Sequence, residues 1–316
     1  MKFLALFLSL AILWVVAGCA QVGSPVASPT AVPATATPSP PPSATFTAVP
    51  PTATATPSPT CTATAVPATP TPSPSPLPTT GTWSGQQTGS LTVPVDSGNG
   101  ITETVEVHYL LYLPQGYGQE PAQKWPLVVF LHGSEERGDD PNLLRREGLP
   151  KLLEGWPDFP AVVVSPQCPQ GKRWWSRAHI VGAFLDQVQS MYAVDTGRIY
   201  LTGISMGAYG AWALALRYPQ RFAALVPIAG GANAVGDDMP PNLCDLVGLP
   251  VWVFHGRLDQ NVPYTESERA VQALRACGGN VRFTLYDDAA HREAWERAYQ
   301  DQALYQWLFA QRRMGL

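Results

Sequence analysis

The sequence is poor in charged residues and in cysteine, and it has no clear metal-binding pattern. Charged residues make up 14% of the 316 positions and the net charge is −4, so composition gives no reason to expect a nucleic-acid partner. The five cysteines and five histidines fall at no spacing that resembles a zinc site. The apolar run at residues 3–16 is shorter than the roughly 20 residues of a comfortable membrane span.

That apolar run has the length of a signal-peptide core, with Lys2 before it. It ends in Val16-Ala17-Gly18-Cys19, which resembles the lipobox of bacterial lipoproteins, where the cysteine is lipidated and becomes the new first residue. We therefore predict that residues 1–19 are a lipoprotein signal peptide and that Cys19 anchors an exported protein to the cell membrane or outer membrane. A plain secretory signal and an uncleaved anchor are the alternatives.

Residues 20–82 consist mainly of Pro, Thr, Ser and Ala and carry almost no charge. The heptapeptide ATATPSP occurs at residues 34–40 and again at residues 53–59. With little apolar surface to offset the entropy cost of ordering, such a segment is expected to be a disordered tether that leans towards polyproline conformation. Fully extended at about 3.1 Å per residue, it reaches on the order of 190 Å.

From about Trp83 the composition becomes that of a globular domain, which we place at residues 83–316. Short apolar runs alternate with amphipathic stretches of helical length, which predicts a mostly parallel sheet with helices on both faces. The predicted strands are residues 104–113, 127–131, 161–164, 199–201, 225–228, 251–254 and 281–286. The predicted helices are residues 180–192, 206–218, 265–277 and 294–311.

The segment Gly203-Ile204-Ser205-Met206-Gly207 matches G-x-S-x-G, the nucleophile elbow of α/β-hydrolases. Alone the match is weak, but here a buried strand leads into it and a helix rich in small residues follows it. That setting holds the serine in a strained turn and directs the helix N-terminus at a developing oxyanion. We predict Ser205 as the nucleophile.

A serine nucleophile needs a base, and in this fold the chain order is serine, acid, histidine. Two histidines follow Ser205. His255 ends the buried run at residues 251–254, which leaves His291, expected in a polar loop, as the predicted base. Asp259, in a loop after the strand at residues 251–254, is the predicted acid. Asp287 and Asp288 are its rivals, but they are so close to His291 that they would need a very tight loop.

Two backbone N–H groups should form the oxyanion hole, and we assign them to Met206 and Ser134. His132 begins the loop that contains Ser134 and is expected to position it; His132 is also a candidate for substrate contact. Trp174 and Trp175 are further candidates, because paired exposed rings stack on sugars or aromatic acyl groups, although packing of one ring into the core is an equal alternative. The charged segment at residues 135–137 is expected to be a solvated loop.

Three cysteines fall in the folded part, at Cys168, Cys244 and Cys277. Export permits a disulfide. An odd number allows at most one bond within the domain and leaves one thiol, and the sequence does not choose the pair.

Several segments together resemble bacterial esterases of the phospholipase/carboxylesterase and polyhydroxybutyrate-depolymerase-like group, whose members are often called predicted peptidases. They are FLHGSEERGDD, VVSPQCPQGKRWW, RIYLTGISMGAYGAWALALRYPQRFAALVPIAGG and LPVWVFHGRLDQNVPY, with the region of His291. The resemblance covers nearly everything from about Thr104 onwards. It implies an α/β-hydrolase that needs no cofactor or metal, and it places nucleophile, acid and base on Ser205, Asp259 and His291.

This sequence departs from the resembling group around the base, where Ala290-His291-Arg292-Glu293 stands in place of Gly before the histidine and a small polar residue after it. The change concerns the rim of the pocket. The expected function is an exported serine carboxylesterase that works through an acyl-enzyme and acts on a small or polymer-borne ester. A serine peptidase of the same fold and an inactive, envelope-tethered binding module are the alternatives. The sequence leaves the oligomeric state open.

Overall fold

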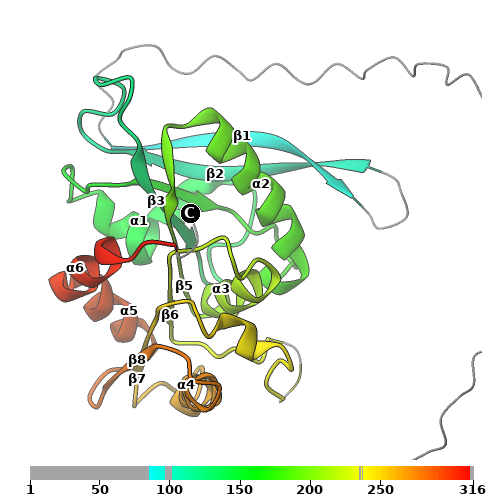
Figure 1. Cartoon of the computed structure of the whole chain (residues 1–316), viewed down its shortest axis with the longest axis vertical. Helices are drawn as coiled ribbons and strands as arrows, with labels where there is room; N and C mark the ends of the chain where they lie inside the picture. Colours follow the sequence, from blue (N-terminus) through cyan, green and yellow to red (C-terminus); the bar gives the residue numbers. More distant parts are fainter. Residues whose placement is uncertain (1–84, 97–101, 235, 237, 314–316) are drawn as a thin grey trace, which may run out of the picture. The chain divides into compact units, whose positions relative to one another are not determined.

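The computed structural model describes residues 85–96, 102–234, 236 and 238–313. The predictions for the signal peptide at 1–19, for Cys19 and for the linker at 20–82 lie outside these residues. The described part contains an eight-stranded sheet in the order β1-β2-β4-β3-β5-β6-β7-β8. The fold is therefore the predicted one, a mostly parallel sheet between two helical layers (Figure 1).

The sheet is parallel except at one edge, where β1 pairs antiparallel with β2 and β2 pairs antiparallel with β4. From β4 to β8 all neighbours run in the same direction, so their carboxyl ends lie at one edge, where α/β proteins place their ligand sites. The strands are β1 (Gly85–Asp96), β2 (Thr102–Leu113), β3 (Trp125–Leu131), β4 (Val162–Pro166), β5 (Val194–Ile204), β6 (Ala224–Ile228), β7 (Val251–Gly256) and β8 (Val281–Tyr286).

Helices cover both faces of the sheet (Figure 1). One layer is α2 (Ala178–Met191), α3 (Met206–Arg217) and α4 (Tyr264–Ala276). The other is α1 (Gly148–Leu153), α5 (His291–Gln300) and α6 (Gln302–Ala310). Short 3₁₀ turns lie at η1 (Pro141–Arg146), η2 (Trp174–Arg177) and η3 (Leu243–Leu246). In the described part of the chain, every helix is too short or too polar to span a lipid bilayer.

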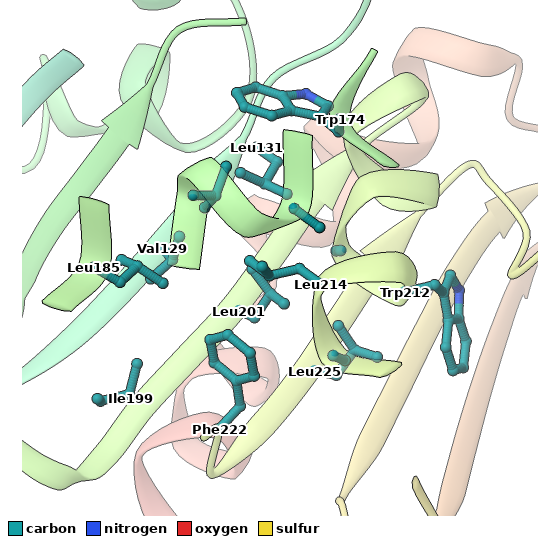
Figure 2. Close-up of a cluster of buried hydrophobic side chains, with 14 of the residues drawn as sticks. Val129, Leu131, Trp174, Leu185, Ile199, Leu201, Trp212, Leu214, Phe222 and Leu225 are labelled. Atoms are coloured by element: carbon teal, nitrogen blue, oxygen red, sulfur yellow. The ribbon is translucent and has the colours of Figure 1, made fainter. Parts of the chain in front are cut away.

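The central strands are apolar on both faces because each face supports its own core. On β3, Val129 and Leu131 pack towards the layer of α2 and α3, as Figure 2 shows. Phe130, one residue along, packs into the opposite layer against Tyr299 of α5. Burying each such side chain contributes about 1.5–3 kcal/mol, so both layers clamp the strands whose ends carry the site.

The seven predicted strands and the helices α2, α3 and α4 are present, with boundaries moved by a few residues. The edge strand β1 and the helix α1 were not predicted. The helix expected at residues 294–311 is two helices, because Asp301 leaves the helical conformation and its side chain accepts from Ala303 N at 2.9 Å, which starts α6. His291 was expected in a polar loop, but the structure makes it the first residue of α5.

A disulfide joins Cys244 in η3 to Cys277, which follows the last residue of α4. Cys168 is the remaining thiol of the described residues; it is buried, and burial raises its pKa to about 11. The three cysteines thus form one disulfide and leave one buried thiol, which agrees with the prediction of at most one disulfide within the domain.

Candidate active site

Ser205 lies at the turn between β5 and α3, at the carboxyl edge of the sheet. Its backbone has φ 51° and ψ −121°, a conformation that non-glycine residues rarely adopt. The turn is possible because the flanking glycines let backbones touch. A Cβ on Gly203 would lie 2.3 Å from the carbonyl oxygen of Gly207, and one on Gly207 would lie 1.9 Å from that of Leu131.

The structure brings Ser205, His291 and Asp259 together in one chain of hydrogen bonds. His291 Nε2 lies 3.0 Å from Ser205 Oγ, and His291 Nδ1 lies 2.5 Å from Asp259 Oδ2. An ionised carboxylate can only accept, so Nδ1 carries the imidazole proton and Nε2 is free to accept the proton of Ser205. The edge of the Trp295 ring packs on the imidazole, with centroids 4.9 Å apart.

Asp259 is buried, yet every side of its carboxylate meets a donor. Oδ1 accepts from the backbone N–H groups of Asn261 and Val262, both at 2.9 Å. Oδ2 accepts from His291 and lies 3.0 Å from His255 Nε2. Burial alone raises the pKa of Asp259, but the hydrogen bonds from the two histidines and from Val262 outweigh it and hold that pKa well below its usual value. The acid is therefore ionised at neutral pH.

Met206 and Ser134, the predicted oxyanion donors, are both near Ser205, one next to it in the chain and the other in the lining of the same cavity. Met206 is the first residue of α3, where an N–H has no partner within the helix. Ser134 lines the cavity that contains Ser205. The Ser134 N–H and the Gly133 carbonyl belong to the same peptide group, so the orientation of that group sets the direction of the N–H.

His132 fixes that peptide. Its Nε2 accepts from Cys168 N at 2.9 Å, so its proton is on Nδ1, which donates to the Gly133 carbonyl oxygen at 2.6 Å. Burial lowers the pKa of His132 to about 3, which keeps the ring neutral. In a trans peptide the carbonyl and the N–H point in opposite directions. Because His132 holds the Gly133 carbonyl oxygen, the Ser134 N–H points away from the His132 ring.

Two of the three predicted substrate contacts are wrong, because the side chains are inside the protein. His132 is 1% exposed and Trp174 is 2% exposed. Trp174 packs edge-on against His132 and donates from Nε1 to the His132 carbonyl oxygen at 2.9 Å. Neither side chain lines the cavity, and both pack against the backbone that leads to Ser134.

Trp175 is half-buried and points elsewhere. Its ring packs against Tyr209 of α3, with centroids 6.3 Å apart, and Arg173 lies over it at 5.2 Å. Trp175 is not among the residues that line the cavity around Ser205. Of the described residues, the aromatic side chain that does line it is Trp295.

The cavity around Ser205 and His291 has a volume of about 960 Å³. Its lining contains three carboxyl side chains, Glu135, Glu136 and Glu147, and one cation, Arg292. Glu136 was expected in a solvated loop but is 5% exposed, and burial raises the pKa of its carboxyl group. The lining therefore combines these carboxyl groups with apolar side chains, such as those of Leu258 and Val262.

Arg292 lies at the rim, where the departure from the resembling group predicted a change. Its guanidinium contacts the buried carboxylate of Glu147, whose second oxygen accepts from Trp295 Nε1 at 3.2 Å. Glu293 instead accepts from Ala290 N at 2.9 Å and caps the start of α5. Sequence reasoning missed Glu147 and Trp295, because no motif links either residue to Ser205 before the fold places them together.

Within the described residues, no group of three or more His, Cys, Asp or Glu side chains is arranged to hold a metal ion. The residues around Ser205 offer an oriented hydroxyl, an imidazole, an ionised carboxylate and backbone N–H groups. This combination suits acyl transfer.

Comparison with known families gives a match of residues 158–303 to the phospholipase/carboxylesterase family. Among curated proteins, a bifunctional acetylxylan esterase/xylanase of Neocallimastix patriciarum is 28% identical over 155 residues, 48% of this chain and 22% of that protein. Poly(3-hydroxyalkanoate) depolymerase C of Paucimonas lemoignei is 40% identical over 47 residues, 15% of this chain and 11% of that protein. The matched region thus spans less than a quarter of either relative.

Solved structures with the same fold include a thermostable esterase, with a TM-score of 0.56 and 31% identity over 71% of this chain and 63% of that one. A ferulic acid esterase aligns with a TM-score of 0.52 over 71% of this chain and 97% of that one. At 18% identity, that second likeness shows the fold alone.

Proposed function

We propose that this chain, which belongs to the α/β-hydrolase esterase group, is a serine carboxylesterase that works through an acyl-enzyme on Ser205. One observation carries the proposal: His291 bridges Ser205 Oγ and Asp259 Oδ2 at 3.0 and 2.5 Å. A complete, oriented set of nucleophile, base and acid argues against an inactive binding module.

In the proposed reaction, Ser205 Oγ attacks the ester carbonyl carbon while His291 Nε2 takes the hydroxyl proton. Asp259 holds the imidazole and stabilises its charged form. The oxyanion accepts from the N–H groups of Met206 and Ser134. His291 then returns the proton to the departing alcohol, which leaves an acyl group on Ser205. Water, activated by His291, hydrolyses that acyl-enzyme and releases the acid.

We propose an ester carried on a polymer or its fragments, such as plant cell-wall ester or polyester, as the substrate. The names of two relatives, an acetylxylan esterase/xylanase and a poly(3-hydroxyalkanoate) depolymerase, support this class. The cavity, at about 960 Å³, is at the upper end of ordinary ligand sites. Its carboxyl groups are good acceptors for substrate hydroxyls and repel a substrate carboxylate.

We also propose that Cys19 carries a lipid and that residues 20–82 hold the domain away from the membrane, so that the substrate is met outside the cytoplasm. The support is the sequence Val16-Ala17-Gly18-Cys19 at the end of an apolar run and the Pro/Thr/Ser composition that follows. Cys19→Ala should free the protein into the medium or periplasm. Continued retention in the membrane fraction would contradict the anchor.

The function is tested by a panel of short-chain, acetylated-sugar and feruloyl esters beside the matching amides, with wild type and Ser205→Ala. The expected result is ester hydrolysis that Ser205→Ala abolishes, with amides cleaved far less efficiently. Amide cleavage that matches ester cleavage in kcat/KM would favour the serine peptidase. Inactivity on every ester, with no difference between the two proteins, would refute an enzyme.

A further inference from the structure

A second histidine contacts the acid of the proposed triad. His255, the fifth residue of β7, is fully buried, and its Nε2 lies 3.0 Å from Asp259 Oδ2, the oxygen that also accepts from His291. Because it comes before Asp259 in the chain, it has no place in the serine, acid, histidine order. The two imidazoles converge on one carboxylate oxygen.

The surroundings of His255 determine where its proton lies. Nε2 is 3.0 Å from Asp259 Oδ2 and 3.0 Å from the Val262 carbonyl oxygen, and neither atom has a proton to give. Nε2 therefore carries the proton and donates to both acceptors. On the other side of the ring, Nδ1 lies 2.7 Å from Ser267 Oγ of α4.

The contacts of His255 extend from Asp259 to the backbone that packs against Ser205. Because Nδ1 carries no proton, Ser267 Oγ shares its one proton between Nδ1 and the Gly230 carbonyl oxygen, which lies 2.9 Å away. A Cβ placed on Gly230 would lie 2.9 Å from the Ser205 carbonyl oxygen. His255 thus connects Asp259 to α4 and back to the segment that packs on Ser205. A histidine that only filled core volume would need no donor directed at the acid.

We propose that His255 is a positioning residue: its Nε2–H holds Asp259 Oδ2 in place and ionised, so that Asp259 can orient His291. This inference rests on the role of Asp259 in the proposed function. His255 touches no substrate, so it acts on the reactivity of Ser205 and leaves substrate binding unchanged.

Two substitutions of His255 by residues with amide side chains distinguish the contact made by Nε2 from the contact made by Nδ1. The amide nitrogen of His255→Gln falls near the former Nε2 and can still donate to Asp259. That of His255→Asn falls near the former Nδ1 and reaches only towards Ser267. His255→Leu removes both the donor to Asp259 and the acceptor that faces Ser267. Tyr305→Phe is the matched control, because it removes a buried hydrogen bond, to the Tyr299 carbonyl oxygen at 2.8 Å, away from the site.

The experiment measures the second-order rate of Ser205 phosphonylation by a fluorophosphonate probe, with kcat and KM for p-nitrophenyl acetate and the melting temperature of each variant. His255→Leu and His255→Asn should lower the phosphonylation rate and kcat about 10- to 100-fold, the effect of losing a charge-assisted hydrogen bond, with KM little changed. His255→Gln should recover most of the rate, and Tyr305→Phe should match wild type.

Equal rates for the Gln and Asn variants would overturn the inference, as would a folded His255→Leu protein that reacts like wild type. If the Leu variant does not fold, the Gln and Asn pair decides alone. A wild-type protein inert to the probe, with Ser205→Ala as its equal, would instead refute the proposed function and this inference with it.

Discussion

His132 Nδ1 donates to the carbonyl oxygen of Gly133 at 2.6 Å, so a ring with 1% exposure sets the direction of the peptide that ends in the Ser134 N–H. The hydrogen bond also polarises that peptide and strengthens its N–H as a donor. The proposed oxyanion hole would therefore depend on a side chain that does not reach the cavity.

Replacing His132 should lower turnover more than binding. His132→Leu removes the donor to Gly133 and leaves Cys168 N–H without its acceptor, so kcat should fall by up to about 100- to 1,000-fold, the range for loss of one oxyanion donor. His132→Asn keeps a donor near Nδ1 and should retain more activity. Steady-state kinetics on p-nitrophenyl acetate provide the measurement; a rise in KM at constant kcat would place His132 in substrate binding instead.

Stability should depend on pH through His132. Burial lowers its pKa from 6.5 to about 3, so between these values the unfolded chain binds one proton more than the folded protein. The free energy of unfolding should therefore decrease as the pH falls from 6.5 towards 3, by about 1.4 kcal/mol per pH unit. Urea unfolding at several pH values tests this, and His132→Asn should lose that part of the slope. Parallel slopes for the two proteins would contradict a buried, neutral His132.

The close contact at Gly207 should make it irreplaceable. In Gly207→Ala the new Cβ would lie 1.9 Å from the Leu131 carbonyl oxygen, a backbone atom that cannot move aside. We expect a loss of more than about 3 kcal/mol or failure to fold. Gly248→Ala is the control, because nothing lies within 4 Å of its Cβ position. Its stability should stay within about 1 kcal/mol of wild type; equal effects of the two substitutions would refute the steric account.

The disulfide should stabilise the fold without contributing to catalysis. It joins Cys244 to Cys277 across a sequence separation of 33, for which the chain-entropy model gives about 3 to 4 kcal/mol. The double variant Cys244→Ser, Cys277→Ser should unfold at lower urea concentration and keep its kcat. Cys168 is the internal control, because its buried thiol should not react with a thiol reagent until the protein unfolds. An unchanged urea midpoint would show that the bond adds no stability.

Much of the fold could be predicted because the buried strands are apolar on both faces, as β3 and β4 show. The edge strand β1 could not, because its sequence GQQTGSLTVPVD is mostly polar and its pairing with β2 supplies the stability. The break at Asp301 was missed because the apolar pattern continues across it. Local pattern identifies the elements that are buried, and tertiary pairing determines the others.

At the site, chain order, loop position and resemblance led to the prediction of Ser205, His291 and Asp259, and the structure places these three side chains in one chain of hydrogen bonds. Their catalytic roles stay a prediction. The surroundings were not predictable in the same way. Trp174 could equally face solvent or the core until its partner, the His132 carbonyl, was placed. His255 was set aside as a base, and its contact with Asp259 became visible only when β7 and the loop after it were in position.

An acyl-enzyme on Ser205 can be detected by intact-mass spectrometry of protein quenched in acid during turnover of p-nitrophenyl acetate. We expect an added acetyl mass that peptide mapping places on Ser205, and none on Ser205→Ala. Replacement of His291 should abolish it as well, because the imidazole must take the serine proton. Turnover of the ester without any added mass on Ser205, or with the acyl group on another residue, would refute the proposed acyl-enzyme.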